Sequence, residues 1–375
     1  MSPSLVILSF SRLVSDPRVQ RQIALFAPLY DVTTVGFGPS PHPGVTHVEI
    51  PEGTRAWPDS KQHLLTRRFR GAYWAMSAVR AAHDLLEGRR GTMDAVLAND
   101  TNTLPLALWL EPRRGVHADL HEYAPREKEH QRSWRWFVAP YQRWLCRTCL
   151  PRVASVTTVS PGLAREYAAR FGVDVEVVTN ASAHRELPVR PTGNPIRLLH
   201  TGVARANRHL ESMLEAMRGL EGRATLDLML MPSEPGYIER LAQLAEEVPG
   251  VALRDPVPFA QLVDTVAEYD VSLVVFPNTT FNLEYSLPNK LFEAVQARTG
   301  VIVGPSPDMA ELVRAHGLGA VLPAADAEAM HAEIAGLTPG TVDGWKRASD
   351  AAAGELSAEQ QVRTWEKTVA AILGD

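Results

Sequence analysis

The sequence predicts an α/β protein built from two doubly wound domains that face each other across a cleft. Short apolar runs alternate with helical patterns along both halves of the chain, as parallel strands and their crossover helices do. The alternation breaks at residues 186–195, where three prolines and one glycine indicate a linker. We therefore expect an N-terminal domain over residues 1–188 and a C-terminal domain over residues 189–356. A last helix over residues 357–375 is expected to cross back to the first domain.

The N-terminal half begins with a predicted strand at residues 5–8, a continuous apolar run typical of a strand buried on both faces. Asp16 followed by Pro17 then predicts the start of a helix, with Asp16 as its N-cap. The remaining strands of this half are predicted at residues 31–36, 45–50, 94–98, 116–120, 155–160 and 176–178.

The same alternation restarts after the linker. Strands are predicted at residues 196–200, 225–231, 251–253, 271–276 and 301–303. Helices are predicted between and after them at residues 208–218, 237–248, 259–268, 289–297 and 309–315. Each half therefore has a Rossmann-like pattern, and sheets of this kind bind ligands outside the carboxyl ends of their strands.

The composition is that of an ordinary globular protein. Hydrophobic residues make up 45% of the 375 residues and charged residues 22%, which argues against disorder. The net charge of −5 gives no general basic field for nucleic acid. No apolar run approaches the ~20 residues that a membrane span needs, and no signal peptide is visible, so we expect a cytoplasmic protein.

The two cysteines, Cys146 and Cys149, have the spacing of a redox motif or half a zinc site. They lie in a helical pattern, and no second pair of cysteine or histidine residues stands at zinc-ligand spacing. We therefore predict two reduced thiols on a helix.

The most informative segment is residues 281–293, a polar loop that leads into a helix. Free backbone N–H groups at a helix start bind phosphate, and Lys290 adds a full positive charge there. Glu293 lies three residues further on the same helix face, where a carboxylate can accept from ribose hydroxyls. The alternative is a capped helix with an exposed Lys–Glu pair, and these residues alone do not decide between the two.

Residues 286–293, Ser-Leu-Pro-Asn-Lys-Leu-Phe-Glu, resemble the donor-site motif of glycosyltransferase family 4, whose members are retaining enzymes with the GT-B fold. Further segments resemble landmarks of that family in the same order: 15–19, 97–101 with 103–105, 119–123, 158–163, 178–181, and 200–202 with 207–211. Each motif is weak alone, but their ordered set covers nearly the whole chain. The resemblance implies a GT-B fold and transfer of a sugar from a nucleotide-sugar.

The sequence departs from the family pattern at one position. The family often carries two glutamates eight positions apart; Glu293 matches the second, and Tyr285 occupies the first, with Glu284 beside it. The resembling subfamily with Ser-Leu-Pro-Asn-Lys often lacks the first glutamate too. Catalysis therefore remains plausible, but the usual contact with a sugar hydroxyl, and with it the identity of the sugar, is open.

The resemblance implies a role for each matching residue. Arg208 and Lys290 would face the diphosphate, with Arg205 as a second candidate, and would stabilise the leaving group without a metal. Glu293 would hold the ribose. The full set expected to bind the nucleotide-sugar is Gly202, Arg208, Ser286, Leu287, Asn289, Lys290 and Glu293.

On the acceptor side, His121 follows a predicted strand and would touch the transferred sugar or the developing charge. We expect His121, Arg208 and Lys290 to be the catalytic residues. Looser candidates for contacts with the acceptor or the sugar are Asp16, Arg18, Asn99, Asp100, Glu122 and Tyr285. Asp16 has the competing interpretation of a plain N-cap.

The implied reaction moves a sugar from a UDP- or GDP-linked donor to a glycan, lipid-linked or small-molecule acceptor, with retention by same-face displacement. The implied class is a hexosyltransferase, with polysaccharide biosynthesis among its uses. We expect no metal, because no Asp-x-Asp pair stands in a metal-binding context, and no cofactor beyond the nucleotide-sugar itself.

Two basic and aromatic segments lie in the predicted acceptor domain. Residues 131–152 hold five arginines, five aromatic residues and no acidic residue, and residues 67–74 form a second cluster. Such segments suit the surface of an anionic membrane or a lipid-linked acceptor, so peripheral contact with the inner face of the cell membrane is a further expectation. The alternative is a pair of helices that pack their aromatics inward, and Pro140 interrupts the longer segment.

Three other functions fit parts of this pattern. A nucleotide-sugar epimerase would use the same donor site without an acceptor. A degenerate GT-B subunit would bind the nucleotide-sugar without catalysis; Tyr285 favours this, whereas His121, Lys290 and Glu293 argue against it. A two-lobed solute-binding protein is the weakest alternative, since no export signal is visible.

Overall fold

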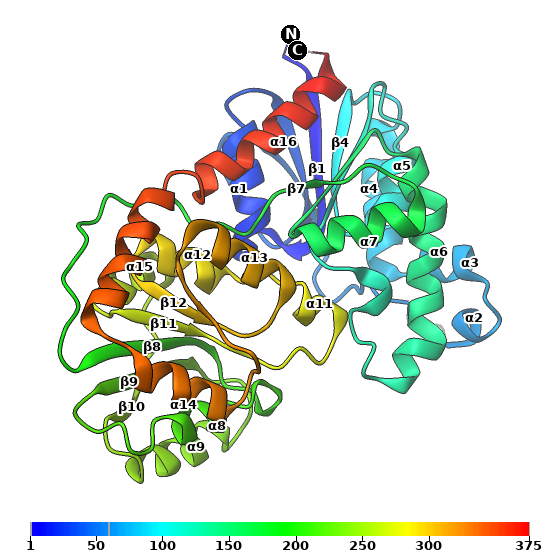
Figure 1. Cartoon of the computed structure of the whole chain (residues 1–375). Helices are drawn as coiled ribbons and strands as arrows, with labels where there is room; N and C mark the ends of the chain where they lie inside the picture. Colours follow the sequence, from blue (N-terminus) through cyan, green and yellow to red (C-terminus); the bar gives the residue numbers. More distant parts are fainter. Residues whose placement is uncertain (1, 59–60, 375) are drawn as a thin grey trace. The chain divides into compact units, whose positions relative to one another are not determined.

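The computed structural model describes residues 2–58 and 61–374, and they form two compact units (Figure 1). Unit 1 consists of the chain up to Thr179, the short segment Thr280–Asn282 and the chain from Gln361 onward. Unit 2 consists of Asn180–Thr279 and Leu283–Gln360. No helix or strand forms over residues 178–195, where the chain passes from the first unit to the second.

The described part of unit 1 contains a seven-stranded sheet in which every pair of neighbours is parallel. The order is β3-β2-β1-β4-β5-β6-β7, so the chain winds outward from β1 in both directions. The strands are β1 Ser4–Arg12, β2 Asp31–Phe37, β3 Thr46–Ile50, β4 Ala95–Asn99, β5 Gly115–Leu120, β6 Ser155–Thr158 and β7 Glu176–Val177. β4 is buried throughout and β1 is buried over residues 5–9, as the apolar runs predict.

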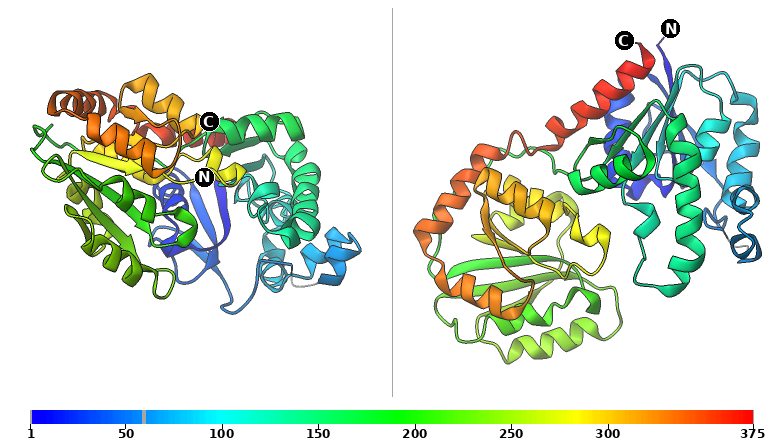
Figure 2. Two further views of the ribbon diagram at one scale, coloured as in Figure 1. Left: turned by 60° about the horizontal axis from the view of Figure 1, so that its bottom comes forward. Right: turned by 45° about the vertical axis from the view of Figure 1, so that its right-hand side comes forward.

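The helices of unit 1 are α1 Pro17–Phe26, α2 Lys61–Leu65, α3 Phe69–Trp74, α4 Ser77–Leu86, α5 Leu104–Trp109, α6 Ala139–Cys149 and α7 Pro161–Phe171. The last helix, α16 (Ala358–Leu373), joins unit 1 from Gln361 onward. Figure 2 shows the end of α16 next to the start of β1. Trp365 and Val369 of α16 share one hydrophobic core with Ile23 of α1 and with β1, so the helix is an integral part of the unit.

The described part of unit 2 contains a six-stranded parallel sheet of order β10-β9-β8-β11-β12-β13. Its strands are β8 Ile196–Val203, β9 Ala224–Met231, β10 Val251–Arg254, β11 Val271–Val274, β12 Gly300–Val303 and β13 Gly319–Val321. Its helices are α8 Glu211–Ala216, α9 Tyr237–Glu246, α10 Leu262–Val266, α12 Asn289–Gln296, α13 Pro307–His316, α14 Ala327–Gly336 and α15 Pro339–Ala352. The short helix α11, Phe281–Glu284, begins in unit 1 and ends in unit 2. One hydrophobic core involves α8, α9 and α14, and a second involves α12, α13 and α15.

The doubly wound α/β class is confirmed, and each strand predicted from the sequence is present. The strand β13 and the helices α2 to α5, α7, α11, α14 and α15 have no counterpart among the elements predicted by residue range. Arg208 lies in a 3₁₀ turn, Ala206–Arg208, rather than at the start of α8. Cys146 and Cys149 are free and buried on α6, as predicted. Among the described residues no helix is both long enough and apolar enough to span a membrane.

Candidate functional site

Each sheet has one point at which its strand order reverses, and the predicted site residues gather near these points. In unit 2 the reversal lies between β8 and β11, and in unit 1 between β1 and β4. Parallel sheets bind ligands outside the carboxyl ends of the strands at such a point, because the loops diverge there and leave room. The fold therefore defines one candidate site in each unit.

Lys290 occupies this point in unit 2. It is the second residue of α12, and its ammonium Nζ donates to the backbone carbonyl of Thr201 at the end of β8, at 2.5 Å. Burial, and then the nearby charge of Arg208, lower the pKa of Lys290 to about 8. The ammonium is thus held against the carboxyl end of the central strand, with only one of its protons committed to this bond.

Gly202 and His200 flank this ammonium on β8. A Cβ placed on Gly202 would lie 3.0 Å from Lys290 Nζ and 3.2 Å from His200 Nε2, closer than ordinary packing allows, so the glycine leaves the space that the lysine fills. His200 Nδ1 donates to the carbonyl of Leu273 at 2.8 Å, which leaves Nε2 unprotonated in the neutral ring. Burial, and then Lys290, lower the pKa of His200 to about 3, so the ring stays neutral.

Arg208 supplies a second cation. Its guanidinium lies 5.5 Å from the ring centre of Phe276, and it is close enough to Lys290 to lower the pKa of that lysine. Within the described residues, neither Arg208 nor Lys290 forms an ion pair with a carboxylate, although most ion pairs of the chain join arginine to aspartate or glutamate. Two half-buried cations without an acidic partner form an anion-binding arrangement.

Glu293 lies one turn deeper on α12 and is only 5% exposed. Burial raises its pKa to about 7, against the lowering effect of Lys290. The alternative of an exposed Lys–Glu pair is therefore wrong, because Glu293 is buried and Lys290 donates to Thr201. Of the other predicted donor residues, Ser286 donates to the Leu283 carbonyl at 3.0 Å and Leu287 is buried in the core beside α12.

Asn289 is the exposed first residue of α12, and Pro288 before it provides no side-chain cap. The backbone N–H groups at this helix start thus lie in the same turn as Lys290. Tyr285 stands in the loop after α11 and is half-buried. The structure therefore brings Gly202, Lys290 and Arg208 together, with Asn289 and Glu293 on the same helix as Lys290.

The candidate site of unit 1 is built around a buried carboxylate, Asp119, near the end of β5. Arg18 of α1 forms a two-pronged ion pair with it, at 2.7 Å from Nε and 2.6 Å from Nη2. Burial alone would raise the pKa of Asp119, but Arg18 and His121 hold it well below its ordinary value. Asp119 also accepts from Gln22 at 2.8 Å and from Thr157 at 2.7 Å, so the buried charge is compensated on all sides.

His121 lies immediately beyond β5, and its side chain is 22% exposed. Its Nε2 is 3.4 Å from Asp119 Oδ2 and 3.2 Å from Asn99 Oδ1, and its Nδ1 is 3.6 Å from Asp100 Oδ2. Burial lowers the pKa of His121, but Asp100 and Asp119 outweigh this effect and raise it above the ordinary value. The site therefore favours a protonated, positively charged imidazole that still reaches solvent.

Three of the looser candidates, Asn99, Asp100 and Glu122, lie next to this histidine. Asn99 is the last residue of β4, is buried, and exchanges hydrogen bonds of 2.9 Å with Gln22. Asp100 has a left-handed backbone, φ 63°, and its carboxylate accepts from the backbone N–H of His121 at 3.0 Å. Glu122 accepts from Asn282 at 3.3 Å.

Asp16 is the N-cap of α1, where it accepts from the backbone N–H groups of Arg18 and Val19, each at 3.2 Å. This is its competing interpretation, and the cap explains the residue without a ligand. The Arg18 guanidinium pairs with Asp119 and donates a hydrogen bond to the Val178 carbonyl at 2.8 Å. Arg18 is thus placed to fix Asp119.

Four important residues of these sites were not among the predicted site residues: Asp119, His200, Gln22 and Trp365. His200 carries a detectable signal, because it directly follows the apolar pair Leu198-Leu199 in its strand. Gln22 lies one helical turn beyond Arg18, so it shares that helix face. Trp365 donates from Nε1 to Asp119 and to Thr157, at 3.3 Å each, and the Arg18 guanidinium lies 4.6 Å from its ring centre. Nothing local in the sequence connects α16 with β5.

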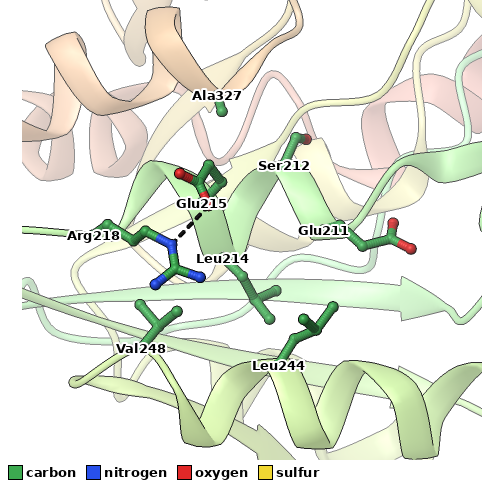
Figure 3. Close-up of a pocket in the computed structure, with 8 residues that line it drawn as sticks. All are labelled: Glu211, Ser212, Leu214, Glu215, Arg218, Leu244, Val248 and Ala327. Carbon is green, nitrogen blue, oxygen red and sulfur yellow. Dashed lines mark hydrogen bonds and ion pairs between the residues drawn. The ribbon is translucent and has the colours of Figure 1, made fainter.

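A surface pocket of about 300 Å³ lies elsewhere in unit 2 (Figure 3). α8 and α9 line it with Leu214 and Leu244, and Arg218 pairs across its rim with Glu215 at 2.7 Å. None of the predicted site residues is among its lining. It forms part of neither candidate site.

No family model matches the sequence, and no curated protein sequence is significantly similar to it. Solved structures do match, and they are GT-B glycosyltransferases, whose fold consists of two Rossmann-like domains. The GT-B fold of this chain, predicted from its ordered motifs, is thereby confirmed.

Three of these structures show the extent of the likeness. Sucrose-phosphate synthase from Thermosynechococcus elongatus is 14% identical, with a TM-score of 0.70 over 98% of this chain and 100% of its own. An α,α-trehalose-phosphate synthase (UDP-forming) from Burkholderia vietnamiensis is 12% identical, with a TM-score of 0.70 over the whole of both chains. HepE from Anabaena, solved in complex with UDP and glucose, is 12% identical, with a TM-score of 0.66 over 98% of this chain and 100% of its own.

Proposed function

We propose that this protein is a retaining glycosyltransferase that moves a sugar from a UDP- or GDP-linked donor to a glycan, lipid-linked or small-molecule acceptor, without a metal. The observation that carries the proposal is the pair of neighbouring cations Lys290 and Arg208, which form no ion pair within the described part of the chain, with Lys290 beside Gly202 at the carboxyl edge of the unit 2 sheet. Fold likeness to glycosyltransferases supports it, and the motif resemblance to family 4 supports retention.

The donor's diphosphate is the anion that fits this cluster. When the sugar departs, negative charge develops on the outer phosphate, and cations fixed in advance stabilise that charge without having to reorganise. Lys290, Arg208 and the N–H groups at the start of α12 supply such donors. Glu293, one turn further along, would accept from the ribose hydroxyls.

His121 would act on the transferred sugar. In a charged imidazole whose Nε2 faces Asp119 and Asn99, Nδ1, 3.6 Å from Asp100 Oδ2, would donate a hydrogen bond to a sugar hydroxyl or to the departing phosphate. In a same-face displacement the departing phosphate oxygen takes the acceptor's proton, so His121 serves as a donor and a positive charge rather than as a base.

The test is release of the nucleoside diphosphate from candidate nucleotide-sugars, measured with and without a panel of acceptors. We expect release with one donor and only when an acceptor is present. Lys290→Ala and Arg208→Ala should each lower the rate by roughly 100-fold, the size of an electrostatic contact at a developing charge. Lys367→Ala is the matched control, because Lys367 is 78% exposed, and it should leave the rate unchanged.

Two other outcomes would replace the proposal. Conversion of the nucleotide-sugar into its epimer without an acceptor would identify an epimerase. Tight nucleotide-sugar binding with no turnover on any acceptor would favour the degenerate binding subunit. Where a product forms, NMR of its anomeric proton tests retention, and an inverted anomer would exclude the same-face mechanism.

A further inference from the structure

The two basic and aromatic segments of unit 1 form one surface. Residues 61–80 and 131–152 contain five lysine or arginine residues each and no acidic residue. α2 packs against the helical turn Trp134–Val138, and Phe69 of α3 lies 6.0 Å, between ring centres, from both Tyr141 and Trp144 of α6. Figures 1 and 2 show α2, α3 and α6 as neighbours. We call the exposed part of this surface the basic–aromatic face: Leu65, Arg67, Arg68, Arg70, Arg132, Arg135, Trp136, Phe137 and Arg143.

The aromatic residues of the longer segment divide into two sets. Trp134 and Tyr141 are buried, and Trp134 stacks on Trp57 at 5.4 Å. Trp136 and Phe137 lie between them in sequence but point outward, with exposures of 75% and 39%. The alternative in which all these aromatics pack inward is therefore wrong for Trp136 and Phe137.

The local backbone explains this division. Pro140 has no N–H to donate, and its ring collides with the carbonyl four residues earlier in a regular helix. The turn Trp134–Val138 is a π-helix instead, a wider turn that relieves this conflict and keeps the chain helical into α6. At about 100° per helical residue, Trp136 lies about 200° around the axis from Trp134, on the side that faces solvent.

The charges of this face are unpaired. Among the described residues, the six arginines of the basic–aromatic face form no ion pair, whereas other surface arginines of unit 1 pair with glutamate, as Arg90 does with Glu111 and Arg126 with Glu129. The whole chain carries a net charge of −5, so this concentration of positive charge is local. Like charges kept close together cost free energy unless they meet an anionic partner.

We propose that the basic–aromatic face docks on the surface of an anionic membrane. Trp136, Phe137 and Leu65, which is 63% exposed, would enter the boundary between headgroups and acyl chains, and the arginines would meet lipid phosphates. Nucleic acid also offers phosphates, but it provides no place for the aliphatic side chain of Leu65. This surface function is independent of the donor site, since it rests on none of its residues.

The experiment is flotation of the purified protein with vesicles of phosphatidylcholine alone and of phosphatidylcholine mixed with phosphatidylglycerol. We expect binding to the mixed vesicles only, and weaker binding as salt screens the charges. Trp136→Ala combined with Phe137→Ala should weaken binding by on the order of 100-fold, because burying each of the two side chains contributes about ten-fold. Arg132→Ala and Arg135→Ala should each weaken binding to the mixed vesicles by about five-fold.

Matched variants of unit 2 separate this face from general surface effects. Phe259→Ala removes another exposed aromatic residue, 68% exposed, and Arg347→Ala removes another exposed arginine. Both should float as the wild type does. All variants should keep the thermal unfolding temperature and the nucleotide binding of the wild type, so a failed donor-site proposal would not affect the result.

Three results would overturn the proposal. The first is that the wild type fails to float with anionic vesicles or floats equally well with neutral ones. The second is that the variants of the basic–aromatic face bind anionic vesicles as tightly as the Phe259 and Arg347 controls do. The third is that a single-stranded RNA oligomer displaces the protein from vesicles and that the same substitutions weaken RNA binding. That result would identify the face as a nucleic-acid surface.

Discussion

The shifted pKa values of Lys290 and Glu293 determine how donor binding depends on pH. The pKa of Lys290 is lowered to about 8, so the lysine loses its proton, and with it the attraction for phosphate, as the pH rises through that value. Glu293 has a pKa raised to about 7 and becomes a charged acceptor for ribose only above it. Burial is the main cause of both shifts; the charge of Arg208 adds to the shift of Lys290, whereas the charge of Lys290 opposes the shift of Glu293.

We therefore predict that nucleotide-sugar affinity is greatest between about pH 7 and pH 8. Well above this window the affinity should fall by about ten-fold per pH unit, because each step removes the Lys290 proton from more of the protein. Titration calorimetry from pH 6 to 9.5 measures it, with the nucleotide-sugar as ligand because a free terminal phosphate itself titrates near pH 6. Lys290→Arg should abolish the alkaline loss, and an unchanged alkaline limb in that variant would show that another group is responsible.

Asp119 is the residue on which the unit 1 site depends. Its pKa is held well below its ordinary value, so its contribution to stability is complete above the pKa of an unfolded aspartate. That contribution is lost as the pH falls through the lower value of the folded state. The acid side of the stability curve should therefore report on the Arg18–Asp119 pair.

Asp119→Asn should destabilise the protein by about 3 kcal/mol, because it leaves the buried Arg18 without its counterion. It should also lower the pKa of His121, which NMR titration measures, since one of the two carboxylates that raise it is gone. Asp100→Asn removes the other carboxylate, which is half exposed, and provides the same pKa readout in a variant that keeps the buried pair. Exposed Asp84→Asn is the control. If the pKa of His121 were unchanged in both variants, Asp119 and Asp100 would not be the groups that raise it.

At the scale of elements, α16 completes a site whose other members come from the first half of the chain. Trp365 is fully buried, and it both donates to Asp119 and stacks with Arg18. A cation over an indole ring gains from the ring's negative face, and the indole N–H satisfies a lone pair of the buried carboxylate. The helix thus contributes to the electrostatics of the site as well as to its core.

Trp365→Phe should cost about 1–2 kcal/mol, because the ring packing remains while two hydrogen bonds are lost. Trp365→Ala should cost about 3–5 kcal/mol through the cavity that it creates. Urea unfolding of both variants measures this, with the neighbouring exposed residue as the control in Glu366→Ala. If Trp365→Phe were as costly as Trp365→Ala, the hydrogen bonds and not the packing would dominate.

The elements that could be predicted are those determined by local sequence. Asp16 and Pro17 predict the start of α1 because a cap and an N1 proline act within one turn. β13 was not predicted, because three half-buried residues give almost no pattern. The contact between Trp365 and Asp119 joins residues 246 positions apart, and no short-range rule connects them. His121 could be predicted as a site residue, but the partners that set its charge could not.

At the scale of the whole molecule, structural similarity defines the fold, whereas the individual residues determine the chemistry. Solved GT-B structures align over nearly the full chain at 11–14% identity in sucrose-phosphate synthase and the trehalose-phosphate synthases. Similarity at this level defines the fold and leaves the chemistry to the individual residues. The ordered motifs were sufficient to predict the fold because the strand-end loops that carry them are fixed by the topology of each sheet.

The central claim is that the cluster around Lys290 binds the donor nucleotide. The most direct measurement is a thermal-shift screen of the wild type and Lys290→Ala against UDP, GDP, dTDP and ADP, each with and without its common sugars. We predict that one nucleotide stabilises the wild type, by ~2.7 kcal/mol at ~100 times its dissociation constant, and leaves the folded Lys290→Ala variant unshifted. The claim would be contradicted if no nucleotide shifted the wild type, or if the same nucleotide stabilised both proteins equally.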